Sequence, residues 1–120
     1  MILVDTSVWV SHLRDGSFKL EQLLNDGDVL GHPFIIGELA CGNIKNRSEI
    51  LSLLNALPKA DFLDDEEVLL FIEKNNLMGK GLGLIDIHLL ASTILNEAAL
   101  WTVDTKLKHE AFILGVSYEY

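Results

Sequence analysis

The amino-acid sequence predicts an α/β protein in which helices cover both faces of a parallel β-sheet. Short unbroken apolar runs recur along the chain, and segments with the apolar spacing of an amphipathic helix separate them. Parallel strands need such crossover helices, and a sheet buried on both faces has continuously apolar strands. The chain has 120 residues, 49% of them hydrophobic, without repeats or low-complexity tracts. We therefore expect residues 1–120 to form a single domain with a substantial core.

The expected strands are all short. The clearest are the apolar run Ile2-Leu3-Val4 near the start and the run from Leu100 to Val103. In chain order, the five candidate strands cover residues 2–4, 28–31, 62–63, 100–103 and 116–118.

Helix signals fill the segments between these strands. Residues 5–7 offer capping side chains directly after the first apolar run. Pro33 suits the first turn of a helix, Pro58 stops one, and the acidic run at 64–67 suits a helix N-terminus. The predicted helices cover residues 8–13, 19–25, 33–45, 48–57, 64–72, 85–97 and 104–114.

Charge and cysteine content argue against several classes of protein. Nine Lys and Arg residues against 18 Asp and Glu residues give a net charge of −9, which disfavours nucleic-acid binding through a broad basic face. Cys41, the single cysteine, offers neither an intramolecular disulfide nor a zinc-thiolate cluster and is compatible with a reducing cytosol. The apolar runs are too short to span a bilayer, and no cationic segment marks a signal peptide. We expect a cytoplasmic protein that does not associate with membranes.

Two acidic residues directly follow predicted strands. Asp5 comes after residues 2–4 and Asp104 after residues 100–103, so both are expected at the carboxyl edge of the sheet. Open α/β sheets bind their ligands at this edge, and the two carboxylates converge if their strands are neighbours. The alternative is that each acid only caps the helix that follows it.

Two further acidic residues lie on predicted helices. The residues three and four positions from Glu38 are apolar or small, so Glu38 is predicted to point from the stripe that faces the core. A carboxylate there needs a cation, hydrogen bonds or an open cleft, unless the helix is rotated to bring Glu38 to its boundary. Asp86 stands in the first turn of another helix after a glycine-rich loop, where an acid also favours the helix dipole.

Taken together, these four acids predict a site for a hard cation. Carboxylate oxygens suit Mg²⁺ or Mn²⁺, which keep water ligands and commonly bind a phosphate of the substrate. Histidine adds no recognisable metal-binding spacing. We expect each of the four histidines to be a surface or boundary residue: His12, His32, His88 and His109.

Other side chains that nucleic-acid binding would use are expected to have ordinary roles. The basic residues are scattered and should be solvated: Arg14, Lys45, Arg47, Lys80, Lys106 and Lys108. Trp9, Phe34 and Trp101 lie within apolar runs, so we expect them in the core or at an interface.

Four short segments around the acids resemble the motifs of one protein family. They read Asp-Thr-Ser-Val-Trp-Val from Asp5, Gly-Glu-Leu-Ala-Cys-Gly around Glu38, Leu-Ile-Asp-Ile-His-Leu-Leu-Ala around Asp86, and Trp-Thr-Val-Asp-Thr-Lys-Leu around Asp104. In order, spacing and total length they are similar to the four acidic motifs of PIN-domain ribonucleases of the VapC toxin type. The resemblance covers nearly the whole chain, and all four acidic positions match.

This resemblance implies a five-stranded parallel sheet between helices and a metal-dependent endoribonuclease that acts on structured RNA such as tRNA or rRNA. The four acids would be both the catalytic and the metal-binding residues, with a supporting hydroxyl near Asp5 from Thr6 or Ser7. The family also implies a homodimer and a cognate VapB-type antitoxin whose C-terminal segment covers the acidic groove. A metal ion held there would activate a water and neutralise charge on the scissile phosphate.

Two other functions remain open on the sequence. A receiver-type phosphoacceptor signalling domain shares the α/β sheet, the Mg²⁺ and acids at strand ends, but it expects paired acids where Thr6 and Ser7 follow Asp5. A catalytically silent PIN fold would act as a binding module, which the intact acids disfavour. A haloacid-dehalogenase phosphatase needs an acid in place of Ser7, and the chain lacks a phosphate-binding GxxxxGK[ST] loop and a GxSxG nucleophile elbow.

Overall fold

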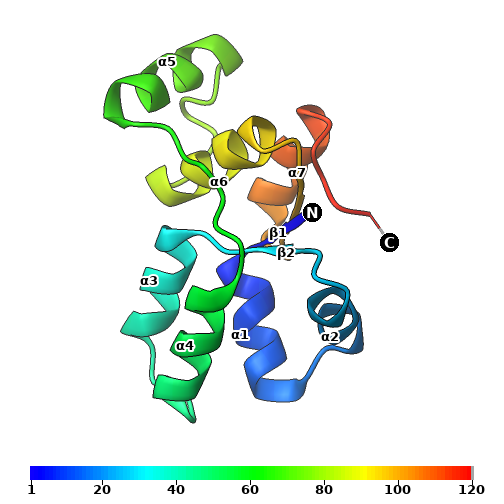
Figure 1. Ribbon diagram of the computed structural model, residues 1–120. Helices are drawn as coiled ribbons and strands as arrows, with labels where there is room; N and C mark the ends of the chain where they lie inside the picture. The colour runs from blue at the N-terminus through cyan, green and yellow to red at the C-terminus, as the bar shows by residue number, and fades with distance from the viewer. Residues whose placement is uncertain (120) are drawn as a thin grey trace.

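The structure is a computed structural model that describes residues 1–119 (Figure 1). Within these residues three short strands alternate with helices. In chain order the elements are β1 (Ile2–Val4), α1 (Thr6–Asp15), α2 (Phe18–Asn25), β2 (Val29–Leu30), α3 (Pro33–Cys41), α4 (Arg47–Ala56), α5 (Asp65–Asn75), α6 (Leu84–Leu95), β3 (Ala99–Trp101) and α7 (Thr105–Ile113).

The strands form a parallel sheet in the order β2-β1-β3. The central strand β1 aligns Leu3 with Leu30 on one side and with Leu100 on the other. These leucines are buried, as expected for strands that are covered on both faces. The predicted α/β class with a parallel sheet between helices is therefore confirmed.

The expected number of five strands is not reached. At each edge of the sheet a further extended segment makes a single parallel bridge, Gly31 with Lys59 on one side and Leu100 with Ser117 on the other. The bridge at Ser117 lies within the predicted strand 116–118. The bridge at Lys59 lies before residues 62–63, so the prediction of a strand at 62–63 is wrong. Pro58 has no N–H group with which to lengthen this edge, and the chain turns away so that Phe62 is 52% exposed.

The helices lie in two layers, one on each face of the sheet, because the chain crosses the sheet first toward one edge and then back toward the other. Figure 1 shows α1 to α4 on one side of the strands and α5 to α7 on the other. The connections from β1 through β2 to residue 59 run toward one edge of the sheet, and those from residue 59 through β3 to residue 117 run back toward the other. Right-handed crossovers place these two sets of helices on opposite faces. The winding direction thus changes between β1 and β3, and open α/β sheets bind their ligands at the carboxyl ends of the strands at such a switch point.

One predicted helix is shorter than expected. The segment predicted as 33–45 ends at Cys41, and α4 begins only at Arg47. Gly42 leaves helical geometry with ψ near 170°, and Asn46 has a left-handed backbone with φ of 53°. Among residues 1–119, no helix is long and apolar enough to cross a membrane.

Candidate active site

Asp5 lies at the carboxyl end of β1 in a network of hydroxyl groups. Its side chain is 6% exposed, and Oδ2 accepts hydrogen bonds from Ser7 Oγ at 2.7 Å and Thr102 Oγ1 at 2.8 Å. Asp5 occupies the N-cap position of α1, but its side chain makes no capping hydrogen bond. The proposal that Asp5 is only a helix cap is therefore wrong, and two donors instead hold the carboxylate in one orientation.

Asp104 follows the neighbouring strand β3, so both acids lie at the carboxyl edge of the sheet, at the switch point between β1 and β3. Oδ1 of Asp104 accepts a hydrogen bond from the backbone N–H of Leu107 at 3.0 Å, which caps α7. The capping role predicted as an alternative is correct for this residue. It engages one carboxylate oxygen and does not exclude a second role for the other.

Thr102 joins the two acids and was not predicted as a site residue. Its hydroxyl donates to Asp5 and accepts the backbone N–H of Asp104 at 3.1 Å, while Ser7 Oγ accepts the N–H of Val103 at 3.3 Å. The ends of β1 and β3 are thus locked together by two hydroxyl groups. The sequence shows only a polar residue, Thr102, within an otherwise apolar run; its burial is visible only in the structure.

Glu38 lies on the exposed side of α3, where it contacts Thr6, the residue after Asp5. The buried residues of α3 are Ile35 and Leu39, whereas Glu38 is exposed, so its predicted position in the core-facing stripe is wrong and the boundary alternative is correct. Oε1 of Glu38 accepts a hydrogen bond from Thr6 Oγ1 at 2.7 Å. Of the two candidate hydroxyls, Ser7 therefore contacts Asp5, and Thr6 contacts Glu38.

Asp86 lies in the first turn of α6 and interacts electrostatically with Asp104 and Asp5. Its Oδ2 accepts the backbone N–H of Gly83 at 3.0 Å. The pKa of Asp86 is raised above its ordinary value, mainly by burial. The Gly83 hydrogen bond opposes this shift, while the carboxylates of Asp104 and Asp5 add to it. Three acids that belong to three different elements therefore share one electrostatic field.

The donor chemistry of this group suits a hard divalent cation. Within residues 1–119, no three His, Cys, Asp or Glu side chains are close enough to form a ready-made metal cage. Mg²⁺ does not require such a cage, because it usually keeps several waters and takes only one or two carboxylates directly. A divalent cation would also offset the burial of the Asp86 charge and its repulsion from Asp104 and Asp5. The carboxylate residues therefore fit Mg²⁺ or Mn²⁺.

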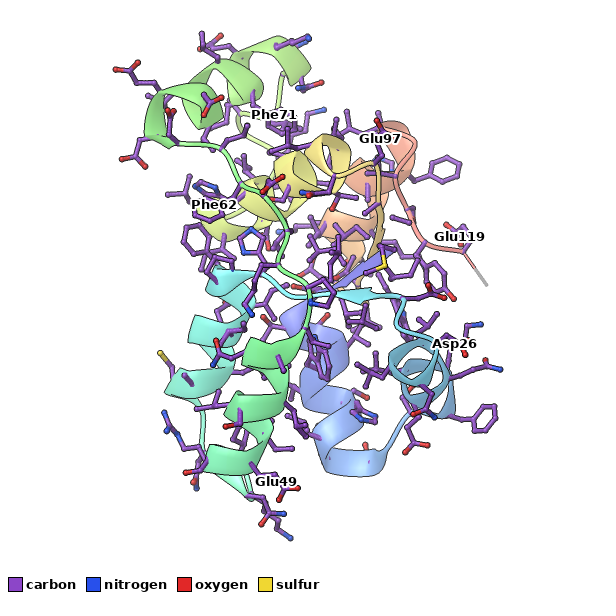
Figure 2. All side chains as sticks on the ribbon, in the orientation of Figure 1. Asp26, Glu49, Phe62, Phe71, Glu97 and Glu119 are labelled. Carbon is purple, nitrogen blue, oxygen red and sulfur yellow. The ribbon has the colours of Figure 1, made fainter. Side chains whose placement is uncertain are left out.

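Two histidines predicted at the surface are buried between α3 and α6. His32 is fully buried; its Nδ1 accepts the N–H of Phe34, and its Nε2 pairs with Ser92 Oγ at 3.1 Å. His88 is 5% exposed, packs edge-on against Phe34, and has no hydrogen bond at Nδ1 within the described part of the chain. Phe62, labelled in Figure 2, completes this aromatic group. The group fixes α3, which carries Glu38, against α6, which carries Asp86.

The aromatic residues behave as predicted. Trp9 and Trp101 are buried in the core, and Phe34 is partly buried against the two histidines. They make no exposed platform on which a base could stack.

Comparison with known proteins agrees with this geometry. The model of the PIN domain family matches residues 2–113, so the chain belongs to the PIN domain family. Within that family the chain is of the VapC type. It is 44% identical over 118 residues to proteins named Ribonuclease VapC32 from Mycobacterium tuberculosis strains CDC 1551 / Oshkosh and ATCC 25618 / H37Rv. Each alignment covers 98% of this chain and 95% of the relative.

Proposed function

We propose that this protein is a metal-dependent endoribonuclease toxin that hydrolyses phosphodiester bonds in structured RNA such as tRNA or rRNA. Asp5, Glu38, Asp86 and Asp104 are the proposed catalytic and Mg²⁺- or Mn²⁺-binding acids. The observation that best supports the proposal is that Asp5 and Asp104 follow the neighbouring strands β1 and β3 at the switch point of the sheet, where Thr102 joins them through hydrogen bonds. The name of the Mycobacterium relatives supports the ribonuclease class.

The residues of the chain orient the acids for this chemistry. Ser7 and Thr102 hold Asp5 through two hydrogen bonds, and Thr6 holds Glu38. A divalent cation held by these acids would lower the pKa of a bound water and offset negative charge on the phosphate. That water would be the nucleophile: its oxygen would bond to phosphorus as the bond to the leaving oxygen breaks, and its proton would pass to the leaving oxygen, so no side-chain nucleophile would be needed.

Metal should be required for RNA binding as well as for cleavage. The chain has a net charge of −9, and the acids at the site repel a polyanion. One divalent cation removes two negative charges from this region, and a second removes two more. We therefore expect RNA affinity to fall when the metal is chelated.

The proposed partners are a VapB-type antitoxin and a second copy of the chain. An apolar groove of about 360 Å³ lies between α1, α2 and α4, with Trp9, Leu13, Leu24 and Leu53 among its lining residues. Such a groove suits the apolar face of an amphipathic helix, while a basic segment suits the acidic site. Exposed apolar side chains on α5 to α7 favour a homodimer: Leu69, Leu70, Leu84 and Phe112. We propose a cytoplasmic location, where the RNA substrate is found.

Cleavage of a total bacterial RNA pool tests the proposed activity. Purified protein should cut the pool at one or a few sites with Mg²⁺ or Mn²⁺, not with EDTA, and the fragment ends identify the substrate. Asp5→Asn should abolish the cuts, whereas Asp26→Asn, which neutralises an exposed acid after α2 (labelled in Figure 2), should leave them unchanged. Expression in a bacterial host should arrest growth for the wild type and not for Asp5→Asn.

Two other outcomes of these assays would argue against the proposed function. Cuts that persist in Asp5→Asn would point to a contaminating nuclease or to a different site. A folded protein that binds Mn²⁺ but cuts no RNA would favour the silent binding module instead.

A further inference from the structure

The loop 79–83 lies along one face of α7 and fixes the direction of Lys106. Lys80 Nζ lies 3.8 Å from Oε1 of Glu110, which is buried. One turn earlier on the same face of α7, the side chain of Lys106 lies against the bare backbone of Gly81. A Cβ atom at Gly81 would stand only 2.9 Å from Lys106 Nζ and 3.0 Å from its Cδ, and Gly81 has a φ of +76°. Glycine thus leaves the space in which this lysine lies.

The same loop contacts the acidic site. The backbone N–H of Gly83 donates to Asp86, and Gly83 follows Gly81 by two residues, which span at most about 7 Å. The side chain of Lys106 therefore lies against the loop whose last residue, Gly83, binds Asp86.

Lys106 is available for an external anion. Within residues 1–119, the ion pairs closer than 4.0 Å join Arg14 to Asp15 and Lys80 to Glu110, so Lys106 belongs to neither. Its side chain is exposed, and it makes no hydrogen bond to a described residue. Lys80, in contrast, is held by a buried carboxylate. Of Lys80 and Lys106, only Lys106 has no carboxylate within 4.0 Å among the described residues.

We propose that Lys106 binds a backbone phosphate of the RNA substrate next to the scissile bond. This inference rests on the proposed ribonuclease function and adds a substrate-contacting residue to it. The protein carries a net charge of −9, so a cation held against the loop that binds Asp86 offers RNA one of few attractive contacts near the acids. A lysine ammonium acts as a point charge on phosphate and fits a contact that positions the strand without reading its sequence.

RNA affinity measured without cleavage tests this contact. The probe is bulk bacterial tRNA labelled with fluorescein at the 3′ end, with Ca²⁺ in place of Mg²⁺ and fluorescence anisotropy as the readout. We expect Lys106→Ala to bind about tenfold more weakly at low salt and to lower the slope of log affinity against log salt by about 0.7 to 0.9. Lys106→Arg should retain most of the affinity.

Lys74→Ala is the matched control, because Lys74 is exposed in the last turn of α5, a helix that carries none of the four acids. This variant should bind within about twofold of the wild type, and thermal melting should show both alanine variants folded. Equal affinity and equal salt slope for Lys106→Ala and Lys74→Ala would overturn the proposal, as would a wild type that binds no tRNA. If the wild type binds tRNA but cuts no RNA, a selective defect in Lys106→Ala still supports the contact while the ribonuclease proposal fails.

Discussion

Protonation of His32 should destabilise the fold in mild acid. Nδ1 of His32 accepts the Phe34 N–H at the start of α3, so a neutral ring carries its proton on Nε2 and donates it to Ser92. Burial, with a smaller contribution from His88, lowers the pKa of His32 from 6.5 to about 4. The added proton must go to Nδ1, where it breaks the cap of the helix that carries Glu38.

The size and sign of the effect follow from this pKa. Between pH 6.5 and 4 the unfolded chain binds the proton and the folded protein does not, so the free energy of unfolding falls as the pH falls. The loss amounts to about 3 kcal/mol by pH 4, of which about 1 kcal/mol is already lost by pH 5.5. His88, whose pKa is also lowered by burial, acts in the same direction.

Urea unfolding at pH 7 and pH 5.5 measures the contribution, and both conditions stay above the isoelectric point near 4.7. His32→Asn keeps a good capping side chain but does not titrate, so it should lose about 1 kcal/mol less than the wild type between these two conditions. His109→Asn, at an exposed position on α7, should follow the wild type. An equal loss of stability in His32→Asn and the wild type would refute the reasoning.

Three further substitutions test the site. Asp86→Asn removes a carboxylate that is disfavoured mainly by burial and also by repulsion from Asp104 and Asp5, and it keeps an acceptor for Gly83. We therefore expect the Tm of the metal-free protein to rise by a few degrees while cleavage falls at least about tenfold; a lower Tm would contradict the electrostatic account. Thr102→Val removes a donor to Asp5 and should cost about 2 kcal/mol in urea unfolding and about 10- to 100-fold in Mn²⁺ affinity, whereas Thr102→Ser should retain both. Gly81→Ala should lower the free energy of unfolding by about 1 kcal/mol, because the backbone at Gly81 has a positive φ. The added Cβ should also displace Lys106 and so weaken tRNA binding as Lys106→Ala does. Unchanged tRNA binding would show that this loop does not position Lys106.

The convergence of Asp5 and Asp104 could be predicted because it depends on a local pattern and one topological rule. Each follows an apolar run, and parallel strands end at the same edge of a sheet. The alternation of apolar runs with helical spacing likewise predicted the layers, since each strand must be covered on both faces.

The orientation of Glu38 could not be predicted in the same way. Helix α3 has nine residues, and apolar residues occur on most of its faces. The periodicity of its sequence therefore does not define one buried face. The contact that places Glu38, its hydrogen bond with Thr6, joins residues 32 positions apart and depends on how α1 and α3 pack.

Buried polar residues were missed for a related reason. Thr102 has the high strand propensity of a β-branched residue, which conceals the role of its hydroxyl. The burial of His32 and His88 depends on the packing of α3 against α6, and a histidine in the sequence carries no signal for it. The number of strands was overestimated because the two edge segments, at residues 59 and 117, each form a single bridge and not a strand.

The position of bound Mn²⁺ in a crystal tests the central claim that these acids form a metal site for RNA cleavage. Anomalous scattering at the manganese absorption edge locates the ion independently of any model of its ligands. We expect a peak at the carboxyl ends of β1 and β3, about 2.0–2.3 Å from a carboxylate oxygen of Asp5 and within reach of Asp86 and Asp104 directly or through water. The peak should disappear in Asp5→Asn. A fully occupied ion elsewhere on the protein, or no ion at these strand ends in millimolar Mn²⁺, would contradict the account.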